Sequence, residues 1–445
     1  MIPISFFLLL ISQSVSITDL YVGYPNKSKN FKTIQDAINE ADSINPKSEN
    51  DRVIIHLSPG IYRQQLMIKT AYLSLINEEP EKEVKITWYY GAGYKYYSVG
   101  DNGRYNETRF QEKLNKTGKV WYNGCTVFAT WRAVYFRAEN ITFENSFNRY
   151  ITEEEIEDGV EPMSEKYIIR NKNTDPNALE AAQGACSFSA EAAYTEFYNC
   201  KFLSCDSTVF AQAKAIYYKN CFLEGQTDII FGGGNVVFHS CIIRWKGFSK
   251  NSTGGCISSS LAGNGIKPYT GYLFYKSKII GNKDLNVTSG VFGRAWGTNE
   301  TKITFINTTL ENDKMITKEG WGALHCPPEE VDGFLEYGTK LKNGKLVDVS
   351  QRKGHIIPYI DFNEFNITSY LNNWTPHYFN FGKDLDEQED KEDDDNKNII
   401  LICSIFGGIL LIIIFIIIIF CVKRNKSESI EKIFEKQEAV KLMDD

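Results

Sequence analysis

The chain has 445 residues, of which 42% are hydrophobic and 24% charged, and its formal net charge is −7. Acidic residues are concentrated at positions 383–395, so the rest of the chain is close to neutral. No stripe of basic residues interleaved with aromatic residues is present, which argues against a protein that binds nucleic acid.

The two ends of the chain predict its compartment. Residues 1–16 have an apolar core of signal-peptide length and end in Ser14, Val15 and Ser16, which suit signal-peptidase cleavage. Residues 399–422 form an uncharged run long enough to cross a hydrocarbon core of roughly 30 Å, and Lys423 follows at once. Basic residues on that flank place the C-terminus in the cytosol. We therefore expect a single-pass type I protein of the cell surface or of a secretory-pathway membrane, with its main domain extracellular or lumenal.

Between these ends the sequence predicts three further segments. Residues 17–380 are long enough for one solenoid domain, residues 381–398 read as a solvated acidic stalk, and residues 423–445 are a cytoplasmic tail too short to fold alone. Asn-X-Ser/Thr sequons before the span predict that the protein is a glycoprotein. They lie at Asn26, Asn106, Asn115, Asn140, Asn251, Asn286, Asn299, Asn307, Asn366 and Asn373.

A repeat runs through the middle of the chain. Cys200, Cys221 and Cys241 each follow a small polar residue and precede an apolar pair. A period of about 20 residues, rich in β-branched and aromatic residues and with Asn, Gly and Ser at the corners, is typical of stacked strand-turn coils. A β-sandwich is the alternative, but it would show hairpin signals every ~8–12 residues. We therefore predict an all-β fold, a right-handed parallel β-helix.

Eight of the ten cysteines precede the predicted span, where an oxidising compartment permits disulfides. Residues one coil apart stack at a strand spacing of ~4.8 Å, which lies within the Cα separation of a disulfide. We expect Cys221 to pair with Cys241, and the other pairings stay open.

Two aspartates in the repeat are candidates for a site. Asp206 and Asp228 are 22 residues apart, which is close to one coil, so we expect them side by side on one face. A lone aspartate in a solenoid turn is usually a satisfied corner residue, but a pair one coil apart is more suggestive. The histidines show no metal-ligand spacing and Gly-X-Ser-X-Gly is absent, so we expect no metal, no cofactor and no serine triad.

Eight sequence blocks between about residues 20 and 340 resemble, in order, the signature blocks of the pectinesterases, carbohydrate esterases that demethylate pectin. The blocks are FKTIQDAI (31–38), PGIYR (59–63), AQGA (182–185), CD (205–206), EG with DIIFG (224–225 and 228–232), FGRAW (292–296), GW (320–321) and FLEYG (334–338). The resemblance implies a right-handed parallel β-helix with a long groove that binds homogalacturonan. We expect a monomer whose partner is this polymer.

The same resemblance implies roles for individual residues. The nucleophile of the family's Asp-Phe-Ile-Phe-Gly block falls on Asp228, and the acid/base of its Gln-Asp-Thr-Leu block falls on Asp206. The family arginine falls on Arg294 and its first oxyanion glutamine on Gln183.

Further family features fall on aromatic residues and cysteines. The aromatic side chains of the family's groove fall on Phe231 and Trp296, and a family disulfide across the nucleophile's coil falls on Cys221 and Cys241.

The chemistry of methyl-ester hydrolysis suits these residue types. A carboxylate attacks only when ionised, and a guanidinium such as Arg294 would keep Asp228 ionised. Asp206, beside that negative charge, should have a raised pKa and hold a proton for departing methoxide. The amide of Gln183 would meet the developing oxyanion.

Two departures from the family pattern bear on activity. Cys205, a weak donor, stands where the family has its second oxyanion glutamine, and one extra residue lies between Asp206 and Cys221. An active pectin methylesterase is therefore the first hypothesis, and a catalytically weakened polygalacturonate-binding surface protein of the same fold is the second. A β-helix lyase or glycosidase is the third, although a lyase would usually need a calcium-binding carboxylate cluster and an arginine base.

Overall fold

The computed structural model describes residues 16–91, 124–147, 149–150, 184–247, 254–263, 265–284, 287 and 289–385. Residues 1–15 of the predicted signal peptide, the predicted span at 399–422, the tail at 423–445 and Gln183 lie outside the described residues. Within the described ranges, no helix combines the length and apolar character needed to cross a membrane.

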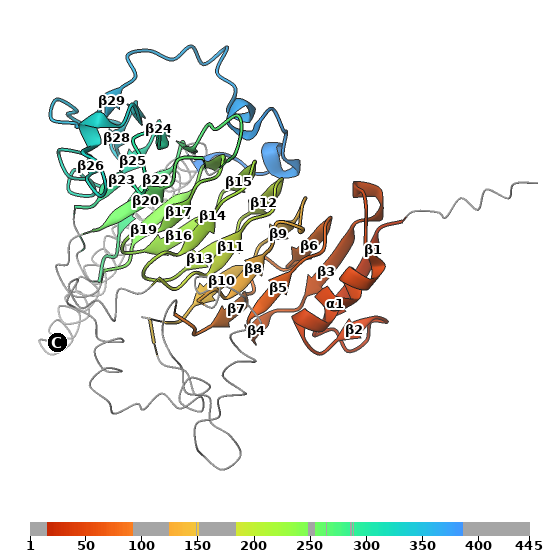
Figure 1. The fold of residues 1–445 in the computed structure, drawn as a ribbon. Helices are drawn as coiled ribbons and strands as arrows, with labels where there is room; N and C mark the ends of the chain where they lie inside the picture. The colour runs from red at the N-terminus through yellow and green to blue at the C-terminus, as the bar shows by residue number, and fades with distance from the viewer. Residues whose placement is uncertain are drawn as a thin grey trace, which may run out of the picture. The chain divides into compact units, whose positions relative to one another are not determined.

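Three long sheets, all of them parallel, make up the described fold (Figure 1). The spatial order of the first sheet is β2 (Asn30–Phe31), β1 (Thr18–Val22), β3 (Val53–Leu57), β6 (Leu73–Ile76), β9 (Arg137–Glu139), β12 (Thr195–Tyr198), β15 (Ile216–Lys219), β18 (Val236–His239), β21 (Tyr272–Tyr275), β24 (Lys302–Ile306), β27 (Gly333–Tyr337) and β29 (His355–Ile356). The order of the second sheet is β28 (Lys340–Leu341), β25 (Thr309–Leu310), β22 (Lys278–Gly281), β19 (Ile242–Trp245), β16 (Phe222–Gly225), β13 (Lys201–Leu203), β10 (Thr142–Asn145), β7 (Val84–Trp88) and β4 (Gly60–Arg63).

The third sheet carries the candidate site. Its order is β26 (Trp321–Gly322), β23 (Val291–Ala295), β20 (Cys256–Ser260), β17 (Ile230–Gly232), β14 (Val209–Ala211), β11 (Phe188–Ala190), β8 (Val127–Ala129) and β5 (Leu66–Ile68). The chain runs through β14, β15 and β16, one strand in each sheet, and returns as β17, which pairs in parallel with β14. This winding confirms the predicted all-β parallel β-helix.

The interior of the solenoid explains why the coils repeat. Phe197, Tyr218, Phe238, Phe274 and Phe305 lie on successive strands of the first sheet, and neighbouring rings stack with centroids 4.2–4.7 Å apart. This separation is close to the ~4.8 Å spacing of paired strands, so one kind of side chain stacks coil after coil. Each coil buries its apolar side only against its neighbours, which makes the stack the stable unit.

The small polar residue before each repeat cysteine forms a corner between the first and second sheets. Asn199, Asn220 and Ser240 have φ values of 50°, 53° and 52°, in the left-handed region. Asn tolerates this conformation better than most residues, which accounts for its place in the repeat. The following cysteines point inward and are buried in the main core.

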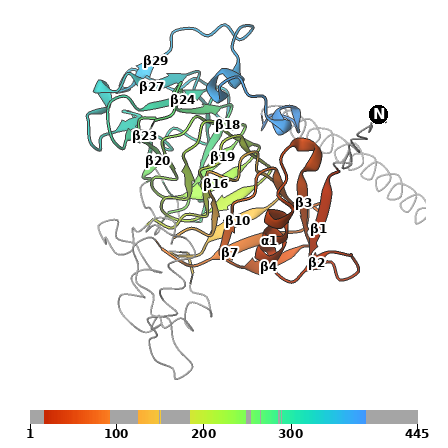
Figure 2. The ribbon, with the colours of Figure 1, turned by 45° about the vertical axis from the view of Figure 1, so that its right-hand side comes forward.

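One α-helix, α1 (Ile34–Ile44), lies at the N-terminal end of the stack (Figure 2). Thr33 caps it by accepting a hydrogen bond from the backbone N–H of Asp36, and Asn45 ends it in a left-handed conformation. Ile34, Ala37, Ile38 and Ala41 face the core. The helix covers the apolar end of the first coils, and the sequence analysis did not predict it.

The last described segment packs against the outer face of the first sheet. Its short 3₁₀ helices η3 (Ile367–Leu371) and η4 (His377–Asn380) bury apolar side chains against strands of that sheet. Two further 3₁₀ turns, η1 (Glu49–Asp51) and η2 (Pro328–Glu330), lie elsewhere in the fold. Asp384 extends the contact, because its carboxylate pairs with Lys219, His239 and Lys276. The contacts of this segment with the first sheet therefore extend at least to Asp384.

Replacing Asp384 by Asn is expected to lower the melting temperature at pH 7 by a few degrees. Burial alone would raise the pKa of Asp384, but hydrogen bonds from His239 and Lys219 lower it below its usual range. A carboxyl with a lowered pKa stabilises the fold above its unfolded value of about 4, and this stabilisation is lost as pH falls. The gap between wild type and variant should therefore narrow in acid. Thermal unfolding measures the difference in melting temperature, with Asn substituted for the fully exposed Asp332 as the control. Equal effects of Asp384→Asn and Asp332→Asn would contradict a stabilising role of Asp384.

Candidate active site

The centre of the site is an ion pair on the outward face of the third sheet. Asp228 lies two residues before the first residue of β17, and Arg294 lies in β23, two strands away in the sheet. Arg294 Nε donates to Asp228 Oδ1 at 2.9 Å and Nη2 donates to Oδ2 at 2.5 Å. Both side chains are partly exposed, 27% for Arg294 and 20% for Asp228. A guanidinium that contacts both oxygens favours the ionised carboxylate, so Asp228 is an accessible anionic group of fixed orientation.

Asp206 lies close to this pair but is buried, with 6% of its surface exposed. Burial raises the pKa of Asp206 to about 8, and the neighbouring negative charge of Asp228 adds to this effect. The hydroxyl of Ser207 donates to Asp206 Oδ1 at 2.8 Å and partly offsets it. At neutral pH Asp206 therefore holds a proton beside an ionised carboxylate, as expected for a proton donor.

The register of the two aspartates differs from the prediction by one residue. Asp206 pairs with Thr227, and Val209 with Ile230, which places Ser207 and not Asp206 opposite Asp228. Ser207 and Asp228 also share a left-handed backbone, with φ values of 55° and 44°. The aspartates are neighbours but do not stand side by side, because a shift of one residue changes which side chain occupies a given position.

This register also accounts for the extra residue in the sequence. The family block Gln-Asp-Thr-Leu fits Asp206-Ser207-Thr208-Val209 without any insertion, and its last two positions then match in character. On that alignment Ser207 stands at the acid/base position and Asp206 at the preceding glutamine. Matching the family's aspartate to Asp206 instead shifts Asp206 one position later in the block and leaves one extra residue before Cys221.

Cys205 directly precedes Asp206 in the chain. Its side chain is fully buried, and burial raises the pKa of the thiol to about 12, so it is un-ionised. Its backbone C=O accepts from the N–H of Gln226 at 2.6 Å. Gln183, the predicted oxyanion donor, lies outside the described residues, but the adjacent Gly184 approaches Ser207: a Cβ there would lie 3.1 Å from Ser207 Oγ.

The predicted aromatic residues do lie beside the ion pair. The rings of Phe231 and Trp296 have centroids 5.9 Å apart. Phe231 is 6% exposed, whereas Trp296 is partly exposed at the surface. Phe210, which the sequence analysis missed, lies against Phe231 at 4.9 Å. It stands one coil before Phe231 in the sheet register, so the repeat itself carried the signal.

The expected disulfide is absent: Cys221 and Cys241 are thiols in the structure, as are the other described cysteines. Their strand neighbours Phe222 and Ile242 are paired, so the two cysteines are in register as predicted. Each thiol instead contacts a backbone carbonyl, Cys221 Sγ that of Lys219 at 3.4 Å and Cys241 Sγ that of His239 at 3.6 Å. The two cysteines are therefore neighbours, as their spacing predicts, but they are not joined by a disulfide.

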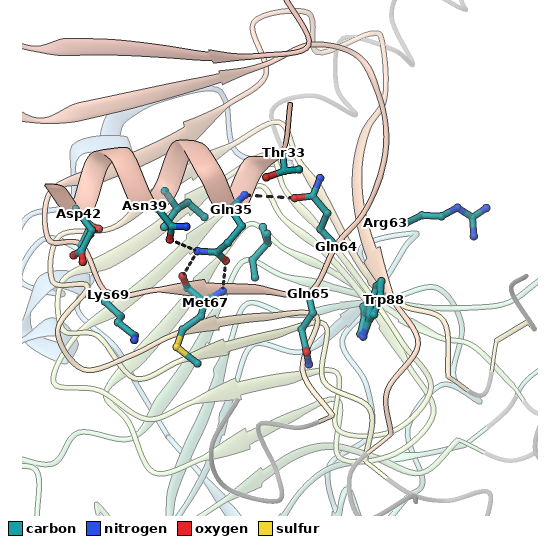
Figure 3. A pocket seen from close by; sticks show the side chains of 13 residues that line it. Thr33, Gln35, Asn39, Asp42, Arg63, Gln64, Gln65, Met67, Lys69 and Trp88 are labelled. Carbon is teal, nitrogen blue, oxygen red and sulfur yellow. Dashed lines mark hydrogen bonds between the residues drawn. The ribbon is translucent and has the colours of Figure 1, made fainter. Parts of the chain in front are cut away.

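A cavity of about 450 Å³ lies away from these residues, between α1 and the edge strand β5 (Figure 3). Gln35 spans it, donating to Asn39 Oδ1 at 3.0 Å and to the C=O of Met67 at 3.2 Å, while Gln64 Oε1 accepts from the N–H of Ile34 at 3.0 Å. These bonds fasten the helix to the first coils, so the polar lining has a structural role. Across the described ranges, no cluster of His, Cys, Asp or Glu is suited to hold a metal ion.

Comparison with known proteins agrees with this architecture. The family model described as Pectinesterase matches residues 156–373. Pectinesterase 31 of Arabidopsis thaliana is 27% identical over 276 residues, covering 61% of this chain and 67% of the relative. Putative pectinesterase 14 of the same plant is 28% identical, covering 42% of this chain, and probable pectinesterase A of Aspergillus fumigatus is 28% identical, covering 44%. The chain spans only 53% and 55% of the length of these last two relatives.

Solved structures share the fold. Pectin methylesterase PemA from Erwinia chrysanthemi superposes with a TM-score of 0.56 at 17% identity, covering 81% of this chain and 98% of that one. The pectin methylesterase of Aspergillus niger gives 0.55 at 20% identity, covering 81% and 99%. The fold thus places the chain among parallel β-helix proteins of the pectin methylesterase type. In sequence the chain is similar to pectinesterases, whose family model matches residues 156–373.

Proposed function

We propose that this protein is a pectin methylesterase, which hydrolyses methyl esters of homogalacturonan to methanol and free carboxylate. The observation that carries the proposal is the two-point ion pair of Asp228 and Arg294 on an accessible face, beside the partly exposed ring of Trp296. A nucleophile held ionised and an aromatic surface for a sugar ring are what this reaction needs.

The proposed reaction divides two roles between two carboxyls. Asp228 attacks the ester carbonyl, and collapse of the tetrahedral intermediate breaks the bond to methoxide, leaving an acyl-enzyme. Asp206 is the source of the proton that methoxide takes, because its burial keeps it protonated near neutral pH. In the second half of the reaction Asp206 receives a proton from the water that cleaves the acyl-enzyme, and Asp228 is released.

Position in the chain suggests where this chemistry takes place. We propose that the predicted signal peptide and span deliver the domain to an extracellular or lumenal face, with Lys423 on the cytosolic side. Pectin would then be the partner of the outward-facing third sheet.

Methanol release from highly esterified homogalacturonan by the full-length protein tests the proposal. We expect release at the same rate with and without a chelator, since no step of the proposed reaction uses a metal. The length of the polymer should not change, which separates an esterase from a lyase or glycosidase. Binding of the polymer without release of methanol would instead establish a catalytically weakened polygalacturonate-binding protein. The serine at the family's acid/base position favours this second hypothesis.

A further inference from the structure

Ser207 occupies the position from which a proton donor would face the nucleophile. It stands opposite Asp228 in the register of the third sheet, and its backbone N–H donates to the C=O of Thr227. Ser207 is partly exposed, whereas Asp206 is only 6% exposed and so is screened from the face where a substrate would lie. A substrate on this face could therefore contact the side chain of Ser207 more readily than that of Asp206.

The side chain of Ser207 is joined to the buried carboxyl. Its hydroxyl donates to Asp206 Oδ1 at 2.8 Å, a hydrogen bond of ordinary length between adjacent residues. A serine hydroxyl is a donor and has two lone pairs, so it can accept a proton on one side while it donates on the other. Gly184 leaves room beside it, because a Cβ at that position would lie only 3.1 Å from Ser207 Oγ.

We propose that Ser207 is a catalytic residue that relays the proton between Asp206 and the substrate. This inference rests on the proposed function, and it deepens it by assigning a residue that the family pattern does not supply. A serine alone is a poor acid at neutral pH, but a serine hydrogen-bonded to a protonated carboxyl passes on that carboxyl's proton.

The relay balances in both half-reactions. When the tetrahedral intermediate collapses, the bond between carbon and methoxide oxygen breaks, methoxide takes the proton of Ser207 Oγ, and Oγ takes the proton of Asp206. Asp206 is then a carboxylate and methanol leaves. In deacylation the attacking water gives a proton to Ser207 Oγ, which passes its own to Asp206, and the acyl bond to Asp228 breaks. The enzyme returns to its starting protonation.

Four variants of the full-length protein test the relay: Ser207→Ala, Asp206→Asn, the double variant, and Ser240→Ala as the control. Ser240 matches Ser207 as a serine with a left-handed backbone, φ 52°, but it lies at the corner between the first and second sheets. We expect Ser207→Ala to lower kcat for methanol release by ~10²-fold, a usual contribution of general acid–base catalysis, and Ser240→Ala to leave it unchanged. Because both members act in one relay, the double variant should be no slower than the slower single variant.

The pH profile supplies a readout that a merely structural role would not move. The hydrogen bond from Ser207 lowers the pKa of Asp206, so removing it should move the alkaline limb of residual activity to higher pH. Losses that multiply in the double variant, or a Ser207→Ala enzyme as active as Ser240→Ala, would overturn the relay while the esterase assignment stands. An inactive wild-type protein would instead overturn the proposed function.

Discussion

Asp228→Asn is expected to reduce methanol release by at least ~10³-fold, since loss of a nucleophile usually removes most of an enzyme's rate enhancement. The amide has the shape of the carboxylate and can still accept one hydrogen bond from Arg294, so the variant should fold and bind polymer. It cannot form the acyl-enzyme, because a neutral amide is not a nucleophile at neutral pH. Initial rates of methanol formation, measured beside polymer binding, give the result.

The exposed residue Asp313 supplies the matched control for this substitution. Asp313→Asn makes the same chemical change at an exposed residue outside the three sheets, in the turn after β25 (Thr309–Leu310), and should leave the rate unchanged. Retention of more than about a tenth of wild-type activity by Asp228→Asn would show that another group is the nucleophile. The site would then have to be assigned afresh.

Asp206→Asn is expected to lower kcat by roughly 10²–10⁴-fold, the usual range for a lost general acid–base group. In the wild type the acylation step needs the protonated form of Asp206, whose pKa is raised to about 8 by burial and by Asp228. Activity should therefore fall as pH rises through about 8, by about tenfold per pH unit. The variant has no such proton to lose, so its residual activity should not show this alkaline limb. Rates measured between about pH 5 and pH 10 test both statements.

The stability of Asp206→Asn separates this effect from unfolding. A carboxyl whose pKa is raised in the folded state favours folding most below its unfolded pKa of about 4, and that contribution is lost as pH rises toward 8. Asn does not titrate, so at pH 7 the variant should melt at a temperature equal to or above that of the wild type. A variant that is both inactive and much less stable would leave the catalytic assignment without support.

The repeat of the coils was open to sequence reasoning, because it is written in local patterns. Cys200, Cys221 and Cys241 follow corner residues with left-handed backbones, and one aromatic side chain per coil stacks on the next. α1 was not foreseen, since it closes the end of the stack and belongs to no coil. The predicted disulfide between Cys221 and Cys241 is absent, because the spacing of two cysteines predicts that they are close but not that they are oxidised.

The residues of the candidate site also differ in how far the sequence predicted them. Asp228 and Arg294 are 66 residues apart, and only the resemblance to a family brought them together before the structure did. The position of Asp206 was one residue out, because the repeat is only approximately regular and two identical residues invited a direct match. The sequence comparison therefore counted one extra residue after Asp206, although Ser207 is the residue that stands opposite Asp228.

By itself the sequence determined the solenoid, the stacking of its coils, and the candidate residues Asp228, Arg294 and Trp296, because these follow from local periodicity and from ordered motifs. Only the tertiary structure decided which residue of the Asp206 coil stands opposite Asp228, which of the two carboxyls is buried with a raised pKa, and that the side chain of Cys205 is buried. These depend on register and on burial, and both are set by pairing between coils. A one-residue change in that pairing moves a side chain from the reacting face to the interior.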